Sequence, residues 1–352
     1  MRDHAHPESG PAEAPLPAGP PHAASPSREP LLRVRDLVVE FDTDAGPLRA
    51  VDGVSFDIYP GETVGLVGES GCGKTVTALS LLRLLPSPPA RIQGGGAVFE
   101  GRDLLRLPIR ELRSLRGKRI GFIFQDPMTA LSPLRRVGDQ LMEVVLLHEP
   151  ISKPEARALA REWLARVGIP DPDQRMRAWP HELSGGMRQR VMIAMALMLH
   201  PSLVIADEPT TALDVTIQAQ IFDLMRALKD RQTAILLITH DLGIVWDMCD
   251  RAIVMYAGRI AEVGPVRSLF AQPRHPYTAG LLRSLPRGTS RGGRLQAIPG
   301  QVPPLSEYAS GCRFADRCPH AMPRCRAAPP LLTPVGEGHA AACVLVSEGR
   351  LP

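Results

Sequence analysis

The sequence has no long apolar run. A membrane-spanning helix needs roughly 20 consecutive apolar residues, and the longest apolar stretches, residues 191–199 and 234–238, fall well short of that length. The N-terminus is polar and rich in alanine and proline, without the basic and then apolar segments typical of a secretory signal. We therefore expect the chain to lie in the cytosol and, if it serves a membrane, to do so from outside the bilayer.

A large excess of one charge sign is also absent. The 352 residues include 41 Lys and Arg against 37 Asp and Glu, a formal net charge of +4, and the two signs are interspersed. A protein that binds nucleic acid is expected to gather its basic residues on one face. We therefore expect no nucleic-acid partner. Hydrophobic residues make up 44% and charged residues 22%, which is ordinary globular usage.

Cysteine is scarce in most of the chain and concentrated near its end. Two of the six, Cys72 and Cys249, stand apart from the rest. The other four are Cys312, Cys318, Cys325 and Cys343. In a cytosolic chain such clustering favours a metal over disulfides, and four thiolates bind either Zn²⁺ or an iron–sulfur cluster. The intervals of five, six and seventeen residues lack the Cys-x₂-Cys unit of structural zinc sites. We favour an iron–sulfur cluster over Zn²⁺, with four reduced, packed cysteines as the third possibility.

Composition divides the chain into three parts. Residues 1–28 are rich in proline, alanine, serine and glycine and cannot bury enough apolar surface to offset the entropy cost of ordering. We predict a disordered tail there, a main domain over residues 29–265 and an extension over residues 266–352. Proline, glycine and arginine are frequent in the extension and its periodicity is weak. It therefore needs another source of order, for which the four cysteines are the candidates.

The main domain is predicted to have an α/β fold. Apolar runs at residues 120–124, 203–207 and 234–239 are too short for buried helices and rich in Ile, Val and Leu. They suit central strands of a parallel sheet covered on both faces. Strand patterns disappear over about residues 126–200, so we expect a helical subdomain inserted into this core. Residues 252–264 are predicted to close the domain as a β-hairpin.

Residues 68–75, GESGCGKT, match the phosphate-binding loop G-x₄-G-K-[ST]. The loop follows the predicted strand TVGLV and precedes a predicted helix, which is the context that such a loop requires. Its glycines let backbone N–H groups surround phosphates, and the helix N-terminus adds a favourable dipole. Lys74 is expected to neutralise the β and γ phosphates and Thr75 to ligate Mg²⁺. The loop residues expected to bind ATP are Gly68, Ser70, Gly71, Cys72, Gly73, Lys74 and Thr75.

The run LVIADE at residues 203–208 is an apolar strand that ends in two carboxylates. In doubly wound folds this end of the strand faces the ligand. Asp207 is the candidate for the Mg²⁺ shell. Glu208 is the candidate for polarising the attacking water, because neighbouring side chains on a strand point in opposite directions. An ordinary acidic strand end would explain the pair by itself, but the phosphate-binding loop in the same chain favours the catalytic interpretation.

The run LSGGMRQR at residues 183–190 predicts a second anion site. Ser184, Gly185 and Gly186 stand directly before a helical stretch, so a hydroxyl and backbone N–H groups meet at a helix N-terminus. The phosphate-binding loop already holds the phosphates of its own nucleotide. A second anion site is explained if it closes on the ATP of a partner chain. We therefore predict a dimer that buries two ATP molecules head to tail.

These motifs occur in the order GESGCGKT, FIFQD, LSGGM, LVIADE, TALD and ITHD. Over residues 31–265 this order resembles the ATP-binding-cassette (ABC) family. The resemblance implies a P-loop NTPase cassette with a parallel-sheet core, an antiparallel β subdomain and an inserted helical subdomain. It also implies an ATPase, dependent on Mg²⁺, that lies peripherally on the cytoplasmic face of the cell membrane and drives separate membrane-spanning subunits.

The same resemblance assigns roles to four further residues. Gln125 matches the glutamine that senses Mg²⁺ and the membrane subunit, Asp214 the aspartate that couples the two ATP sites, and His240 the histidine that contacts the γ-phosphate. Phe41 matches the aromatic residue that stacks on adenine, although a core role would also explain it. Met187 departs from the family, which usually has glutamine there. Because the signature serine and glycines are intact, we expect hydrolysis to survive this change.

Four strings resemble the oligopeptide, dipeptide and nickel importers of this family: QDPMTALSPLRRVGDQL, LDVTIQAQI, HPYTAGLL and IPGQVPPL. None has a chemical reason visible in the sequence. The cysteine-containing extension also resembles this branch, in which some members hold a [4Fe–4S] cluster. The resemblance implies import of peptides or a related solute. The implied partners are two permease subunits, a second ATPase subunit that is related rather than identical, and, indirectly, an extracytoplasmic solute-binding protein.

Two rival functions have less support in the sequence. An ABC ATPase of DNA repair would need a long coiled-coil insertion, and one of translation would need two cassettes in one chain; neither is present. A redox-sensing module with a vestigial ATPase would not need Lys74, Glu208 and His240 to be intact. We therefore expect an ATP-hydrolysing subunit of an importer.

Overall fold

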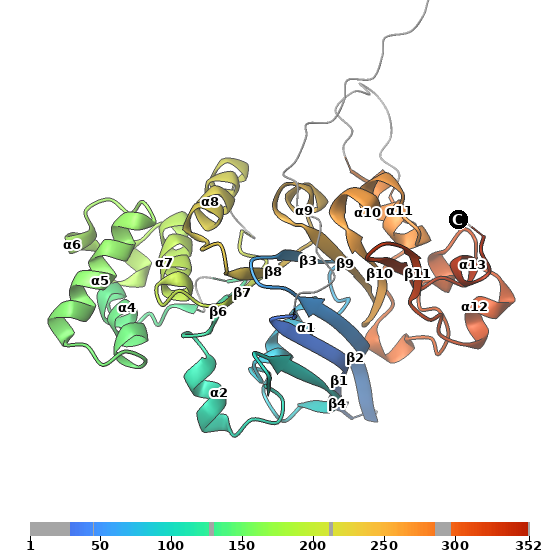
Figure 1. Ribbon diagram of the computed structural model, residues 1–352, viewed down its shortest axis with the longest axis horizontal. Helices are drawn as coiled ribbons and strands as arrows, with labels where there is room; N and C mark the ends of the chain where they lie inside the picture. Colours follow the sequence, from blue (N-terminus) through green and yellow to red (C-terminus); the bar gives the residue numbers. More distant parts are fainter. Residues whose placement is uncertain (1–28, 45, 127–129, 211–213, 286–296, 351–352) are drawn as a thin grey trace, which may run out of the picture.

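Two β-sheets form the frame of the molecule (Figure 1). The computed structural model describes residues 29–44, 46–126, 130–210, 214–285 and 297–350. The larger sheet has eight strands in the order β11-β12-β10-β9-β3-β8-β7-β6, and the smaller has four in the order β2-β1-β4-β5. The predicted disordered tail, residues 1–28, lies outside the described residues.

The strands of the larger sheet are β3 (Thr63–Val67), β6 (Ile120–Ile123), β7 (Leu203–Asp207), β8 (Ala234–Thr239), β9 (Arg251–Tyr256), β10 (Arg259–Pro265), β11 (Thr333–Gly336) and β12 (His339–Ala341). Those of the smaller sheet are β1 (Leu32–Thr43), β2 (Gly46–Ile58), β4 (Ala90–Phe99) and β5 (Arg102–Asp103). The longer helices are α1 (Lys74–Leu81), α4 (Val137–Leu146), α5 (Lys153–Arg166), α7 (Gly185–Leu197), α8 (Val215–Leu228) and α11 (Pro276–Arg283). The shorter ones are α2 (Ile109–Leu115), α6 (Pro172–Arg175), α9 (Leu242–Met248), α10 (Val266–Ala271), α12 (Pro323–Ala327), α13 (Val344–Ser347), and the 3₁₀ turns η1 (Pro180–Glu182), η2 (Leu305–Glu307) and η3 (Ala315–Arg317).

The predicted parallel core is confirmed. Strands β9, β3, β8, β7 and β6 pair in parallel. Every residue of β3, β7 and β8 is buried, which explains their unbroken apolar sequences. Helix α1 lies between the two sheets, while α8 and α9 lie on the opposite face of the larger sheet (Figure 1). Since parallel strands share one carboxyl edge, the residues that follow β3, β7 and β8 meet there.

The smaller sheet is the antiparallel β subdomain that the family resemblance implies. Strand β1 pairs antiparallel with both β2 and β4. Its buried apolar residues join α1 and the larger sheet in one hydrophobic cluster. This cluster fixes α1, and with it the loop that precedes α1, against the parallel core.

A helical group lies at one end of the molecule, drawn in green in Figure 1. It contains α4, α5, α6 and α7, within the range predicted for the inserted subdomain. Helix α5 begins with a capping box, in which Ser152 and Glu155 satisfy each other's backbone N–H groups. Trp163 of α5 is buried in the core of this group. Within the described ranges, no helix has the length and apolar character to cross a bilayer.

The extension continues the larger sheet instead of folding apart from it. Strand β12 pairs antiparallel with β10, and β11 pairs with β12. The fully buried carboxylate of Glu262 on β10 accepts hydrogen bonds from the backbone N–H groups of Arg274 and His275, and it lies 2.7 Å from Nε2 of His339. Sheet pairing and this buried carboxylate therefore order the extension, a source of order that the cysteine count did not indicate.

Candidate functional site

The phosphate-binding loop lies between β3 and α1, as predicted. Gly73 adopts a φ of 102° immediately before α1, and a Cβ atom there would lie 2.8 Å from the carbonyl oxygen of Ala50. A Cβ atom on Gly68 would lie 2.3 Å from the carbonyl oxygen of Met255. Both positions therefore require glycine, because any side chain would displace backbone. The packing of the loop against β2 and β9 determines its curvature.

Lys74 is buried within this loop. Its Nζ donates hydrogen bonds to the carbonyl oxygens of Gly68, at 2.8 Å, and Glu69, at 3.0 Å. The ammonium group is thus held at the centre of the loop, where phosphate oxygens are stronger partners than carbonyl groups. Ser70 and Gly71 are exposed, while Cys72 is buried and its thiol lies 3.8 Å from Nζ.

Thr75 and Asp207 meet across the edge of the sheet. The Thr75 hydroxyl donates to Oδ1 of Asp207 at 3.1 Å. The pKa of Asp207 is raised to about 6, mainly by burial and in smaller part by the negative charge of Glu208, although the Thr75 hydrogen bond and Lys74 act to lower it. A hydroxyl beside a carboxylate, next to the lysine of a phosphate-binding loop, is a donor set that fits Mg²⁺ bound to a nucleotide.

Glu208 lies at the convergence of three strand ends. Its carboxylate accepts a hydrogen bond from Nε2 of Gln125 at 3.2 Å and lies 3.5 Å from Nδ1 of His240. Its backbone has a φ of 43°, unusual for a residue with a side chain, and its N–H donates to the carbonyl oxygen of Ile238. The structure thus brings together three predicted site residues that lie far apart in the sequence.

The signature run caps α7. The Ser184 hydroxyl accepts from the backbone N–H of Met187 at 3.3 Å, and Ser184 and Gly185 are exposed. A Cβ atom on Gly186 would lie 3.3 Å from a methyl group of Ile217 on α8, so this glycine lets the two helices pack closely. Asp214 caps α8 by accepting from the N–H of Ile217 at 3.0 Å.

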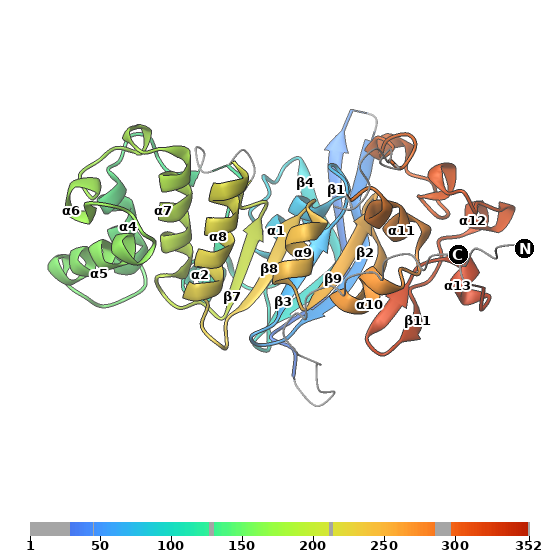
Figure 2. The same cartoon turned by 90° about the horizontal axis from the view of Figure 1, so that it is seen from above.

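The structure does not bring every predicted residue to the phosphate-binding loop. Helix α7, with Ser184 at its start, and helix α1 lie on opposite sides of α8 in both views (Figures 1 and 2). Within one chain, helix α7, which the signature run begins, is therefore separated from helix α1, which Lys74 begins. Phe41 lies in β1, where it is partly buried and packs against the hydrophobic core. Its stacking on adenine remains a prediction.

Sequence motifs did not identify a second set of residues at the loop. Tyr277, Tyr308 and Arg317, all in the extension, form hydrogen bonds with Glu69 or Gly71 of the loop. The one sequence signal for them was the string HPYTAGLL, which contains Tyr277 and whose purpose was not evident from the sequence.

The four clustered cysteines are free thiols. Cys325 and Cys343 are buried, and the N–H of Cys312 donates to the carbonyl oxygen of Cys325 at 2.7 Å. Burial raises the pKa of Cys312 to about 11, and the other three thiols add to the rise. In the described part of the chain, however, no three His, Cys, Asp or Glu side chains are arranged to hold a metal ion. The donor chemistry suits a cluster, but this arrangement does not.

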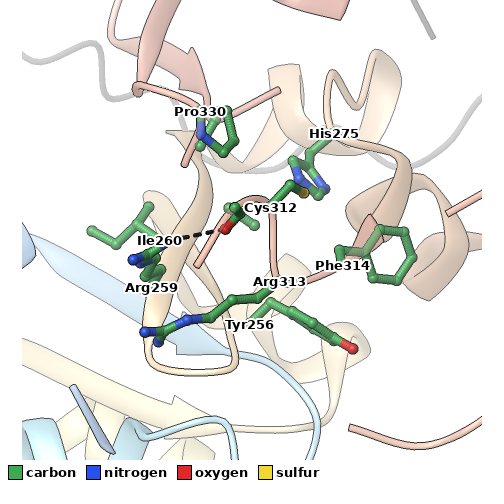
Figure 3. A pocket seen from close by; sticks show the side chains of 11 residues that line it. Tyr256, Arg259, Ile260, His275, Cys312, Arg313, Phe314 and Pro330 are labelled. Atoms are coloured by element: carbon green, nitrogen blue, oxygen red, sulfur yellow. Dashed lines mark hydrogen bonds between the residues drawn. The ribbon is translucent and has the colours of Figure 1, made fainter. Parts of the chain in front are cut away.

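A small cavity opens beside Cys312 (Figure 3). Arg259, His275 and Arg313 are among its lining residues. Arg313 extends away from His275, and its guanidinium forms a 2.7 Å ion pair with Asp52. Arg259 pairs with the same carboxylate, also at 2.7 Å, and donates to the carbonyl oxygen of Gly311. The cavity thus lies where the extension meets the end of β9 and the start of β10.

A phosphate-binding loop on a parallel sheet, with an acid pair at the end of another strand of the same sheet, defines a P-loop ATPase. Residues 51–211 match the ABC transporter family, and residues 261–325 match the C-terminal region of oligopeptide/dipeptide transporters. The chain belongs to the ABC transporter family and is one of its ATP-hydrolysing subunits.

Individual proteins give the same assignment. The chain is 55% identical over 322 residues to a probable peptide ABC transporter ATP-binding protein of Sinorhizobium fredii, covering 91% of this chain and 96% of the relative. It is 54% identical over 302 residues to the oligopeptide transport ATP-binding protein OppD of Salmonella typhimurium, covering 86% and 90%. A solved dimeric ATP-binding cassette, in a post-hydrolysis state with ADP and Pi, aligns with a TM-score of 0.60 at 25% identity, covering 67% of this chain and 99% of that one.

Proposed function

We propose that this subunit energises the import of peptides, or of a related small solute, by hydrolysing ATP on a dimer of cassettes. The observation that carries the proposal is the position of Glu208, which is in contact with Gln125 and His240 beside the Thr75–Asp207 pair. The peptide specificity is supported by the relatives, which are named for peptide and oligopeptide transport.

Each residue of the site has a proposed task. Lys74 and the loop N–H groups bind the phosphates, while Thr75 and Asp207 hold Mg²⁺, which neutralises phosphate charge when bound. Glu208 accepts a proton from the attacking water or polarises it. His240 is exposed next to Glu208, where it is available to the γ-phosphate. Gln125 donates a hydrogen bond to Glu208 and so links it to the segment that leads into the helical group.

The signature run is proposed to act on the nucleotide of a second subunit. Its exposed position on α7 and its separation from Lys74 of the same chain support this arrangement (Figure 2). Closure over two ATP molecules then moves the helical groups and, through them, two permease subunits. We propose a related chain as the second subunit, a solute-binding protein as an indirect partner, and a peripheral position on the cytoplasmic face of the membrane. The three-part division at residues 28 and 265 belongs to the same proposal.

Glu208→Gln tests the catalytic assignment. The amide keeps the shape of the side chain but is no base, so we expect ATP to bind while turnover falls by about a hundredfold or more. The ATP-bound subunits should accumulate as a dimer, measurable by size-exclusion chromatography with light scattering, together with phosphate release. Glu149→Gln, at an exposed ion pair with Lys118, is the matched control. Normal steady-state hydrolysis by the Glu208 variant would exclude the proposed role.

For the four cysteines of the extension we propose a [4Fe–4S] cluster, with Zn²⁺ as the alternative. The support is the donor chemistry of four free thiols in one extension, two of which, Cys312 and Cys325, belong to residues joined by a backbone hydrogen bond. Protein purified without oxygen should be brown and contain iron and acid-labile sulfide. Colourless protein with one equivalent of zinc would replace the cluster by Zn²⁺, and metal-free protein with full ATPase activity would contradict both.

A further inference from the structure

The extension forms a two-pronged ion pair with the phosphate-binding loop. Nη1 of Arg317 lies 2.7 Å from Oε2 of Glu69, and Nη2 lies 3.0 Å from Oε1. The Arg317 side chain is 7% exposed and the Glu69 side chain 30% exposed, so water reaches the pair mainly from the side of Glu69. Paired, planar hydrogen bonds between a guanidinium and a carboxylate are strong and directional. Arg317 therefore restrains both the position and the orientation of Glu69.

A tyrosine of the extension binds the backbone of the same loop residue. The hydroxyl of Tyr277 accepts a hydrogen bond from the N–H of Glu69 at 2.9 Å. His275 caps α11 by accepting from the N–H of Tyr277, and its own N–H is held by Glu262. This chain of contacts gives the HPY string a physical reason, since the histidine fixes the start of α11 and the helix aims the tyrosine at the loop.

A second tyrosine reaches the tip of the loop. The Tyr308 hydroxyl donates to the carbonyl oxygen of Gly71 at 3.3 Å. The guanidinium of Arg313 lies 4.7 Å from the centre of the Tyr308 ring, and it also pairs with Asp52 on β2. Tyr308 is thereby supported from the main domain. The extension thus holds the loop at two backbone groups and one side chain.

These contacts matter for a loop that binds anions. A phosphate-binding loop works through N–H groups that already point at the phosphates, and any ordering it needs on binding lowers its affinity. Glu69 also places a negative charge beside the phosphate site, where it would repel ATP. Arg317 compensates this charge from the side of the extension. Both effects act on nucleotide binding, and neither requires the extension to touch the nucleotide.

We infer that Arg317, Tyr277 and Tyr308 are positioning residues for ATP, through which the C-terminal extension sets the nucleotide affinity of the P-loop. The inference rests on the proposed function, in that Lys74 and its loop bind ATP. It assigns the extension a task in the ATPase cycle of its own subunit.

The test compares ATP affinity and turnover in Arg317→Gln, Arg317→Lys and the unaltered full-length protein. We expect Arg317→Gln to raise the dissociation constant and the KM for ATP about tenfold, on the scale of one charge-assisted hydrogen-bonded pair. At saturating ATP, kcat should change less than twofold, by the same argument that binding and not chemistry is altered. Arg317→Lys keeps the positive charge but loses the paired hydrogen bonds of the guanidinium, so the affinity of this variant for ATP should lie between those of Arg317→Gln and the unaltered protein.

Two controls separate positioning from general stability. Arg324→Gln removes an exposed arginine of the same extension, paired only at the surface with Glu348, and should leave the KM for ATP unchanged. Glu69→Gln removes the charge that Arg317 compensates. In the Glu69→Gln background, Arg317→Gln should therefore have a smaller effect on ATP affinity than in the unaltered protein. A role confined to stability would lower the melting temperature without this coupling.

Each outcome decides the inference. Unchanged ATP affinity in folded Arg317→Gln, or an equal loss in Arg324→Gln, would overturn it. If Arg317→Gln does not fold, Tyr277→Phe decides instead, because it removes one oxygen and leaves the N–H of Glu69 without its acceptor. A several-fold rise in the KM of Tyr277→Phe supports the inference, and an unchanged KM refutes it. Loss of ATP binding in Lys74→Ala, alongside normal binding by Arg317→Gln, would refute the positioning role of the extension while leaving the proposed function intact.

Discussion

The P-loop edge of the larger sheet and the C-terminal extension acquire their order in different ways. At the P-loop edge, the functional side chains lie at the ends of buried strands: Asp207 is the last residue of β7, and His240 directly follows β8. In the extension, order comes from contacts with distant residues, such as β12 on β10 and the three partners of Glu262. This difference explains why the function of the P-loop edge could be inferred from sequence motifs and that of the extension could not. A motif indicates a function when residues that are adjacent in sequence are also adjacent in the site.

The strongest way to sharpen this comparison is Lys74→Ala. The change removes the ammonium group at the centre of the loop, so we expect the dissociation constant for ATP to rise by about a hundredfold or more. Isothermal titration with ATP and Mg²⁺ measures it. Lys118→Ala, at an exposed ion pair with Glu149, is the control and should bind ATP normally. An unchanged affinity in the Lys74 variant would refute the assignment of the loop.

The corresponding change in the extension is Glu262→Ala. It leaves the N–H groups of Arg274 and His275, the second of them buried, and His339 without their partner, so we expect the free energy of unfolding to fall by about 3 kcal/mol. Amide hydrogen exchange should show that α11 and β12 open first, and urea denaturation measures the global loss. Glu307→Ala, an exposed glutamate of the same extension, should cost less than about 0.5 kcal/mol. Equal effects of the two variants would show that Glu262 does not organise the extension.

A smaller effect is expected from pH at the P-loop edge. Because burial raises the pKa of Asp207 to about 6, its protonated form stabilises the ligand-free fold. This contribution is complete below about pH 4, the ordinary pKa of aspartate, and is lost as the pH rises through about 6. Affinity for ATP with Mg²⁺ should rise over the same interval, since the metal needs the carboxylate. Urea denaturation and ATP titration between pH 4 and 8 measure the free energy of unfolding and the ATP affinity. Both quantities should depend less on pH in Asp207→Asn. If the pH dependence is unchanged in this variant, it arises from groups other than Asp207.

Much of the site could be predicted because its chemistry is local. The loop GESGCGKT, the acid pair of LVIADE and the caps of α7 and α8 depend on residues within a few positions of one another. Strands β7 and β8 lie where their apolar runs predicted them. Gln125 is assigned to the site by the family resemblance and not by a local pattern, and only the structure shows its contact with Glu208. The described residues do not show the four thiols arranged to hold a metal ion, and the sequence could not show this, because a set of cysteines indicates a possible donor group but not its geometry.

The sequence by itself determined the parallel core, the phosphate-binding loop and the identity of the acid pair, because glycine, lysine and carboxylate at these spacings have few other uses beside a buried strand. Only the tertiary structure decided what holds the extension and what the extension holds. Tyr277 and Arg317 contact Glu69 although they lie 208 and 248 residues away from it in the sequence. Packing between distant segments makes such contacts, and no local periodicity records them.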